Sequence, residues 1–179
     1  MKRSRSIALL MMGAGSIVLT ACEEPQVEAS IFESVEQCVD QPGASRAACE
    51  EAFAIAEQQH AVVAPKYANR EACEADFGAE QCEQAPEQAQ GGGSIFMPLM
   101  MGYMMGSMMS GRAGAAAQPL YRSADDPKNF RTADNRSVGA ATGRTTVPRA
   151  AAAAPTAKSE TVARGGFGER ARSVGPAST

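Results

Sequence analysis

Residues 32–38 read FESVEQC and residues 67–73 read YANREAC, and this repeated pattern decides the predicted fold. Each copy has an aromatic residue, then a side chain that can cap a helix, then an acid, then a cysteine. Ser34 and Asn69 are preferred N-cap residues, and an acid in the first turn complements the helix dipole. The repeat therefore predicts two short helices, each of which carries a cysteine.

Each copy ends in a cysteine, Cys38 or Cys73, and a second cysteine follows each copy, Cys49 or Cys82. An even number of cysteines in an exported segment indicates disulfides, because the periplasm is oxidising. Four cysteines allow three pairings, of which the repeat favours the local bridges Cys38–Cys49 and Cys73–Cys82. The spacing does not suit a structural zinc site, and no C-x-x-C motif indicates a redox enzyme.

The longest predicted helix runs from about residue 46 to residue 63 and stops before Pro65. Its apolar stripe consists of Cys49, Phe53, Ala56, His60 and Val63. His60 is the only histidine of the chain, and no second metal ligand or nucleophile lies near it in the sequence. The pattern favours a packed histidine, and we predict a small, mainly α module over residues 31–87, stapled by disulfides.

The composition argues against a large enzyme domain. Leu, Ile, Val and Phe together account for about 15% of the 179 residues, below the level typical of a packed core. Residues 115–179 contain only seven of these residues among many Ala, Gly and Pro. Such a segment buries too little apolar area to offset its ordering entropy, so we predict a disordered basic tail over residues 115–179.

The first 22 residues have the pattern of an export signal. A basic start with Lys2 and Arg3 precedes a short apolar run, and residues 19–22 read LTAC. This ending resembles a bacterial lipobox, which predicts a signal peptide over residues 1–21, lipidation of Cys22 and a lipid-anchored linker over residues 22–30. Because Glu23 rather than Asp follows the cysteine, the outer membrane, facing the periplasm, is favoured over the inner membrane.

Residues 88–114 form an apolar segment rich in Met and Gly, without charge up to residue 111. Its methionines are Met97, Met100, Met101, Met104, Met105, Met108 and Met109. Small residues recur at every fourth position, at Gly102, Gly106, Ser110 and Gly114. A helix with this spacing would associate through its small residues, with itself, an envelope partner or lipid, over residues 94–114. A disordered linker and a Cu(I) site of thioethers are the alternatives.

The two halves of the mature chain differ in charge. Residues 22–90 contain 15 acidic and 3 basic residues, whereas residues 91–179 contain 5 acidic and 11 basic ones. The basic half could contact the acidic half or an anionic surface such as lipid head groups. Residues 164–168 read RGGFG and resemble RNA-contacting elements, but an exported protein has no evident nucleic-acid partner, so we predict none.

Three separated motifs resemble one protein family. They are YANREAC at residues 67–73 with Phe77, Gly78 and Cys82, FMPLM and GYMMG at residues 96–106, and RGGFGE at residues 164–169. Together they are similar to the YgiB-type family of uncharacterised bacterial envelope proteins. This resemblance implies an envelope setting but no established fold, activity or catalytic residue.

These patterns predict a non-enzymatic lipoprotein of the cell envelope that acts as a structural or interaction protein in an unknown process. The alternative is a periplasmic Cu(I)-binding protein that uses the methionine-rich segment. We expect no catalytic residues, and no cofactor in the favoured interpretation.

Overall fold

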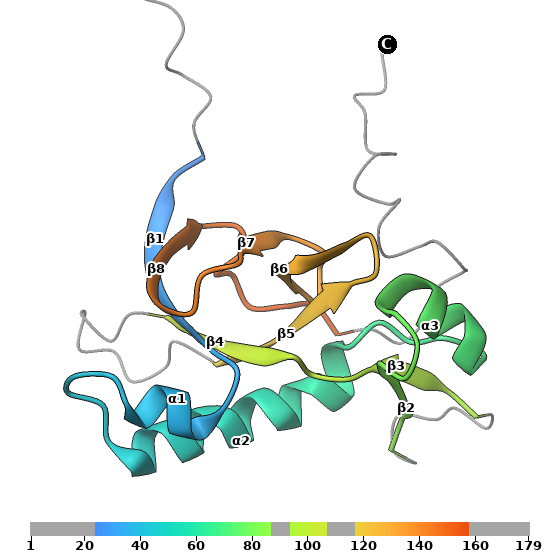
Figure 1. The fold of residues 1–179 in the computed structure, drawn as a ribbon, viewed down its shortest axis with the longest axis horizontal. Helices are drawn as coiled ribbons and strands as arrows, with labels where there is room; N and C mark the ends of the chain where they lie inside the picture. The colour runs from blue at the N-terminus through green and yellow to red at the C-terminus, as the bar shows by residue number, and fades with distance from the viewer. Residues whose placement is uncertain (1–23, 87–93, 107–116, 158–179) are drawn as a thin grey trace, which may run out of the picture.

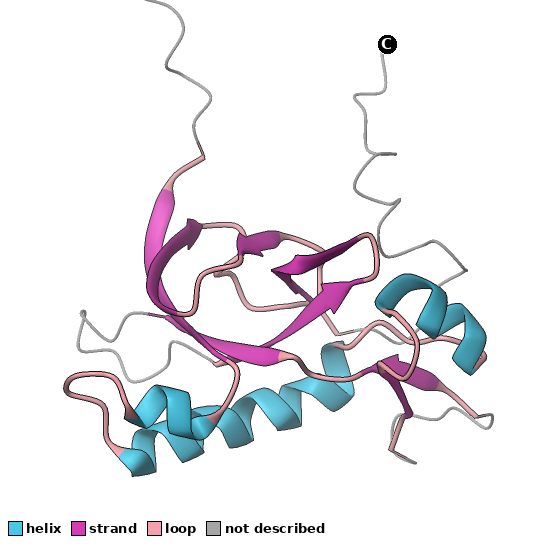
Figure 2. Ribbon diagram, viewed as in Figure 1, coloured by secondary structure: helices cyan, strands magenta, loops and turns pink. Residues whose placement is uncertain are grey.

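The computed structural model describes residues 24–86, 94–106 and 117–157. Within these residues the chain forms one curled, barrel-like antiparallel sheet, a layer of helices along one side of it, and a separate pair of strands (Figure 1). Strands outnumber helices throughout the fold (Figure 2). The fold is therefore mainly β, and the prediction of a mainly α module is wrong.

The elements follow the chain in the order β1 (Gln26–Phe32), α1 (Val35–Val39), α2 (Arg46–Val63), α3 (Arg70–Phe77), β2 (Cys82–Gln84), β3 (Phe96–Pro98), β4 (Gly102–Gly106), β5 (Gln118–Ser123), β6 (Asp126–Thr132), β7 (Ser137–Gly139) and β8 (Gly143–Pro148). The larger sheet has the order β7-β6-β5-β4-β1-β8, and β2 pairs with β3. Its edge strands β7 and β8 approach each other, which makes the sheet nearly closed.

Alternation along the strands builds the inside of the barrel-like sheet. Side chains of successive strand residues point to opposite faces. Ile31, Met104 and Leu120 point inward and pack in one buried cluster with Phe130 and Val147. All five side chains are almost completely buried, so this cluster is the core of the sheet.

The residues next to these in sequence point outward, towards the helices. Phe32 and Tyr103 are cross-strand partners and pack against α2 and the Cys38–Cys49 disulfide. Tyr121, on β5, packs in a third cluster with Tyr67 and the Cys73–Cys82 disulfide. The long helix α2 passes beneath β4 and β5 and thereby joins the two outer clusters (Figure 1).

The helices begin at the residues that the repeat indicates. Ser34 Oγ accepts a hydrogen bond from the Gln37 amide, and Asn69 Oδ1 accepts one from the Ala72 amide at 2.8 Å. Helix α2 has the bounds that the sequence predicts. No helix in the described part of the chain has the length and apolar character needed to cross a membrane.

The prediction of a disordered tail from residue 115 is also wrong, because β5 to β8 lie within residues 118–148. Short strands contribute only one or two inward side chains each, such as Val138 and Val147, and small residues complete the core. A composition rule misses such a core because its apolar residues are spread over several strands. Residues 158–179 of the predicted tail lie outside the described residues.

The Met/Gly-rich segment forms strands where it is described, so its interpretation as a helix with small residues on one face is corrected. Gly102 lies on β4 opposite Leu120. A Cβ atom at this position would lie 2.7 Å from the Phe32 carbonyl oxygen and 3.3 Å from Cε1 of Phe130. Close packing inside the sheet, not contact between helices, therefore requires glycine here.

Candidate functional site

A pocket of about 860 Å³ lies between the outer face of the barrel-like sheet and the hairpin of α1 and α2. Residues of β1, β4 and β8 form its sheet wall, and residues 41–45 with the Cys38–Cys49 disulfide form its hairpin wall. A volume of 300–1,000 Å³ is typical of small-molecule sites. This pocket is the candidate functional site.

The register of β1 and β8 places four polar side chains on the sheet wall. Ser30 is the cross-strand partner of Arg144, and Glu28 is the partner of Thr146. Ala29 lies between Glu28 and Ser30 and points into the core, as Val147 does on β8. Strand alternation therefore turns a carboxylate, a guanidinium and two hydroxyls towards the pocket.

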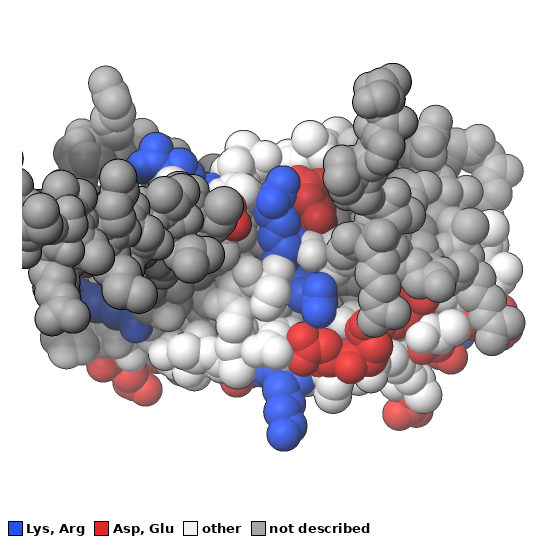
Figure 3. Space-filling view, turned by 90° about the horizontal axis from the view of Figure 1, so that it is seen from above, with Lys and Arg blue, Asp and Glu red and all other residues white. Residues whose placement is uncertain are grey.

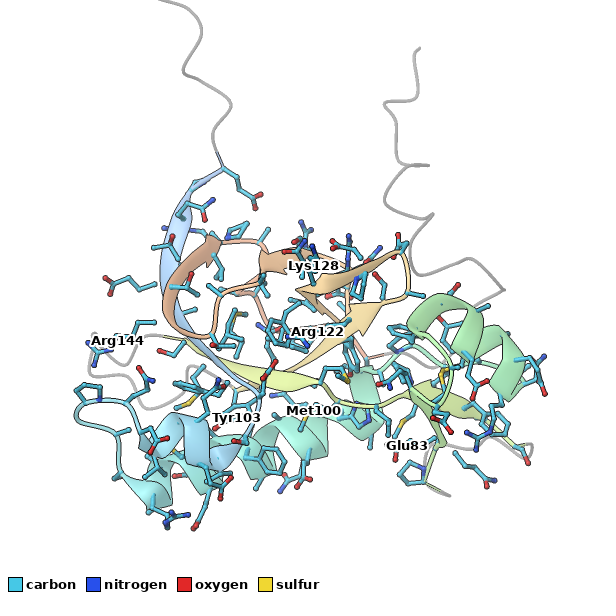
Figure 4. The ribbon with its side chains drawn as sticks, viewed as in Figure 1. Glu83, Met100, Tyr103, Arg122, Lys128 and Arg144 are labelled. Atoms are coloured by element: carbon cyan, nitrogen blue, oxygen red, sulfur yellow. A yellow bond between two sulfur atoms is a disulfide. The ribbon has the colours of Figure 1, made fainter. Side chains whose placement is uncertain are left out.

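Apolar side chains from both the sheet and the hairpin also line the pocket. Phe32, Met105 and Ala48 line it together with the Cys38–Cys49 disulfide. Arg144 joins the two walls, because its Nη2 donates a hydrogen bond to the Pro42 carbonyl at 3.3 Å. Figure 4 shows Arg144 beside the loop between α1 and α2, at the edge of the fold. The pocket is thus amphipathic, because the polar side chains of β1 and β8 lie beside apolar residues of β1, β4 and α2.

The two charged residues of the pocket differ from two arginines on neighbouring strands, which form ion pairs. Arg122 pairs with Glu33 at 2.6 Å, and Arg131 pairs with Asp126 at 3.2 Å. In the view from above, basic side chains near the middle of the face border acidic ones (Figure 3). By contrast, neither Arg144 nor Glu28 has an ion-pair partner among the described residues. The pocket therefore offers one cation and one anion that form no ion pair within the described part of the chain.

A second polar cluster lies between α2, β5 and β2. His60 Nδ1 is 2.9 Å from the Tyr121 hydroxyl, and Nε2 is 3.3 Å from Glu83 Oε1. Burial lowers the pKa of His60, although the Glu83 carboxylate acts in the opposite direction. Both ring nitrogens of the only histidine therefore have partners within the fold, and His60 does not line the pocket.

The structure pairs Cys38 with Cys49 and Cys73 with Cys82, which are the two pairs that the repeat favours. Cys22 lies outside the described residues, as do Ser110 and Gly114 of the predicted association face. Gly106 lies at the end of β4 and lines the pocket.

The methionines are distributed over different parts of the core. Met97 packs beside the Cys73–Cys82 disulfide, Met104 lies inside the barrel-like sheet, and Met101 packs against that same inner cluster. Met100 and Met105 pack against the outer cluster that contains Phe32 and Tyr103. Figure 4 shows Met100 between the sheet and α2. The five described methionines therefore do not converge on one site, while Met108 and Met109 lie outside the described residues.

Comparison with known proteins gives a consistent result. A family model described as a protein of unknown function, DUF1190, matches residues 26–175. A UPF0441 protein of Erwinia tasmaniensis is 45% identical over 168 residues, which cover 85% of this chain and 75% of the relative. A UPF0441 protein of Sodalis glossinidius is 41% identical over 93% of this chain and 83% of its own length.

The chain belongs to this family of uncharacterised bacterial proteins. YgiB is a member of the same family, so the resemblance seen in the three motifs is confirmed. No solved structure matches the chain. The family has no established function, and the pocket residues therefore have to be interpreted from their chemistry.

Sequence reasoning missed all four polar residues of the sheet wall. A signal was present at residues 26–32, where Val27, Ala29 and Ile31 alternate with polar residues. This period of two is typical of a strand with one buried face. What the sequence did not show is that β8, more than a hundred residues later, pairs with β1 and brings Arg144 beside Ser30.

Proposed function

We propose that this protein is a non-enzymatic, lipid-anchored interaction protein of the cell envelope that presents the pocket to the periplasm. The observation that carries the proposal is the arrangement of the cysteines. Four of the five cysteines lie in two disulfides of the fold. Such bonds persist in an oxidising compartment. The fifth, Cys22, ends a lipobox-like pattern.

The start of the fold suits an anchor at this cysteine. Strand β1 begins at Gln26, four residues after Cys22, and an extended chain covers at most ~3.6 Å per residue. A lipidated Cys22 would hold the barrel-like sheet within about 15 Å of the membrane surface. Several acyl chains on one residue would make this attachment stable. Glu23 after the cysteine supports the outer membrane.

A binding role fits the side chains of the pocket better than catalysis does. The only imidazole of the chain is 8% exposed and bonded to Tyr121 and Glu83 in the core. General-base catalysis most often uses a histidine within reach of the substrate. The dispersed methionines favour an interaction protein over a Cu(I)-binding protein, because a metal site needs ligands that converge.

Mass spectrometry of the intact protein from the envelope fraction tests this proposal. We expect cleavage before Cys22, N-terminal acylation, and the loss of two hydrogens for each of the two disulfides. The Cys22→Ala variant should lose both the acyl mass and the cleavage that follows lipidation. An unprocessed N-terminus with all thiols free to alkylate would contradict the proposal.

A further inference from the structure

We propose that the pocket binds a short peptide that carries both a carboxylate and an amine, with the carboxylate at Arg144 and the amine at Glu28. The inference deepens the proposed interaction role and rests on it only for the setting, in which the pocket faces the periplasm. The geometry and charge of the sheet wall carry the rest.

The chemistry of the two charged side chains selects opposite ends of a ligand. A guanidinium has five N–H donors in a planar arrangement that matches a carboxylate. In Arg144, one donor contacts the Pro42 carbonyl, and the others have no partner among the described residues. An ionised Glu28 accepts hydrogen bonds only, and an ammonium group supplies three donors.

The spacing of the two charged residues along the paired strands fits a short peptide. Glu28 pairs with Thr146, two residues beyond Arg144, so Glu28 and Arg144 are diagonal neighbours on one face. The backbone positions of diagonal neighbours in an antiparallel pair lie about 7–8 Å apart. Two extended residues span about 7 Å. A dipeptide or tripeptide can therefore extend from the position of Glu28 to that of Arg144, while its side chains contact Phe32 and Met105.

The same features argue against other ligands. A phosphate-rich ligand would meet the Glu28 carboxylate as well as Arg144, and like charges repel. An acyl chain alone would remove water from Glu28, Ser30 and Thr146 without replacing their hydrogen bonds, which is unfavourable. A ligand that carries both a carboxylate and an amine, together with apolar groups, satisfies both the charged and the apolar residues of the pocket.

Calorimetric titration of the full-length processed protein in detergent tests the inference. The probes are free trialanine, its C-terminal amide and its N-acetyl form, together with the diaminopimelate-containing tripeptide released from peptidoglycan. We expect both unblocked peptides to bind, and each block to weaken trialanine at least fivefold. The tighter of the two unblocked peptides identifies the source, a free peptide or a cell-wall stem.

Variants assign the contacts. Arg144→Gln should weaken unblocked trialanine at least fivefold and should remove the difference between it and its amide. Glu28→Gln should do the same for the N-acetyl form. Arg136→Gln and Glu51→Gln are matched controls, because both side chains are exposed and lie outside the pocket.

Two outcomes would overturn the inference: no binding of any probe, or equal effects of Arg144→Gln and Arg136→Gln. Circular dichroism of each variant shows that the fold is intact. The Cys22→Ala variant should bind the peptides as the parent does, so a failure of the anchor proposal remains distinguishable from a failure of this one.

Discussion

In the helical layer, the stabilising contacts are close in sequence, whereas in the barrel-like sheet they are distant. The disulfides join cysteines 11 and 9 residues apart, and each helix starts at a cap three residues before the amide that it accepts from. In the sheet, Ile31 is paired with Met104 on one side and with Gly143 on the other. The helical layer thus depends on local chemistry, and the sheet depends on close packing between distant segments.

The substitution with the largest expected effect is Gly102→Ala in the sheet. The new Cβ would lie 2.7 Å from the Phe32 carbonyl oxygen, which is backbone and cannot easily move. We expect a loss of about 3 kcal/mol in the free energy of unfolding, as for overpacked cores. Urea unfolding followed by circular dichroism measures it.

Gly43→Ala is the matched control in the hairpin of the helical layer. Gly43 has a positive φ of 81°, and a Cβ there would meet nothing within 4 Å. Only the left-handed backbone conformation is then unfavourable, at about 1–2 kcal/mol. If Gly102→Ala destabilised the protein no more than Gly43→Ala does, close packing in the sheet would not be the dominant requirement.

The second test removes a covalent link from the helical layer. Each disulfide closes a short loop, and in the chain-entropy model such a loop stabilises the fold by about 2–3 kcal/mol. We expect the Cys38→Ala, Cys49→Ala double variant to lose this amount, measured by thermal unfolding. The Cys73→Ala, Cys82→Ala variant should lose a similar amount. A loss below 0.5 kcal/mol for both, within the range of neutral surface substitutions, would show that the caps and packing suffice.

The third test compares two buried tyrosines that lie between the sheet and the helices. The Tyr121 hydroxyl contacts His60, while the Tyr103 hydroxyl has no hydrogen-bond partner among the described residues. Tyr121→Phe leaves His60 Nδ1 unpaired and should reduce the free energy of unfolding by about 1–2 kcal/mol. Tyr103→Phe should change it by less than about 0.5 kcal/mol, since it removes a buried group without a partner. Equal losses in urea titrations would disprove the role of the His60 contact.

The same contrast explains how much of the structure the sequence could predict. Caps, the proline stop and the local disulfides are encoded within about twenty residues, and α2 has the predicted bounds. The strands of residues 118–148 are short and rich in Thr, Gly and charged residues, so local composition suggests disorder. Their core forms only when β1, β4 and β8 come together.

The candidate site follows the same rule. Half of it, the hairpin with Cys38 and Cys49, lies in the predicted module, but the charged wall needs the β1–β8 register. The methionines also illustrate the limit. Met104 and Met105 are adjacent in sequence, yet strand alternation places one inside the sheet and the other on the pocket. Helical spacing predicted one face of small residues with methionines beside it, an arrangement that a strand cannot provide.

The smallest expected effect is the pH dependence caused by His60, which couples the two regions through Tyr121 and Glu83. Its pKa in the folded state is below 6.5, because burial disfavours the charged ring. Below pH 6.5 the unfolded chain gains a proton that the folded chain resists, so the free energy of unfolding falls as the pH decreases, by at most about 1.4 kcal/mol per pH unit. NMR titration is direct, since the chain has one histidine. His60→Gln should lack this component, while the acidic side chains of the helical layer still titrate in both proteins. A His60 pKa at or above 6.5 would show that Glu83 outweighs burial and that water reaches this contact between helix and sheet.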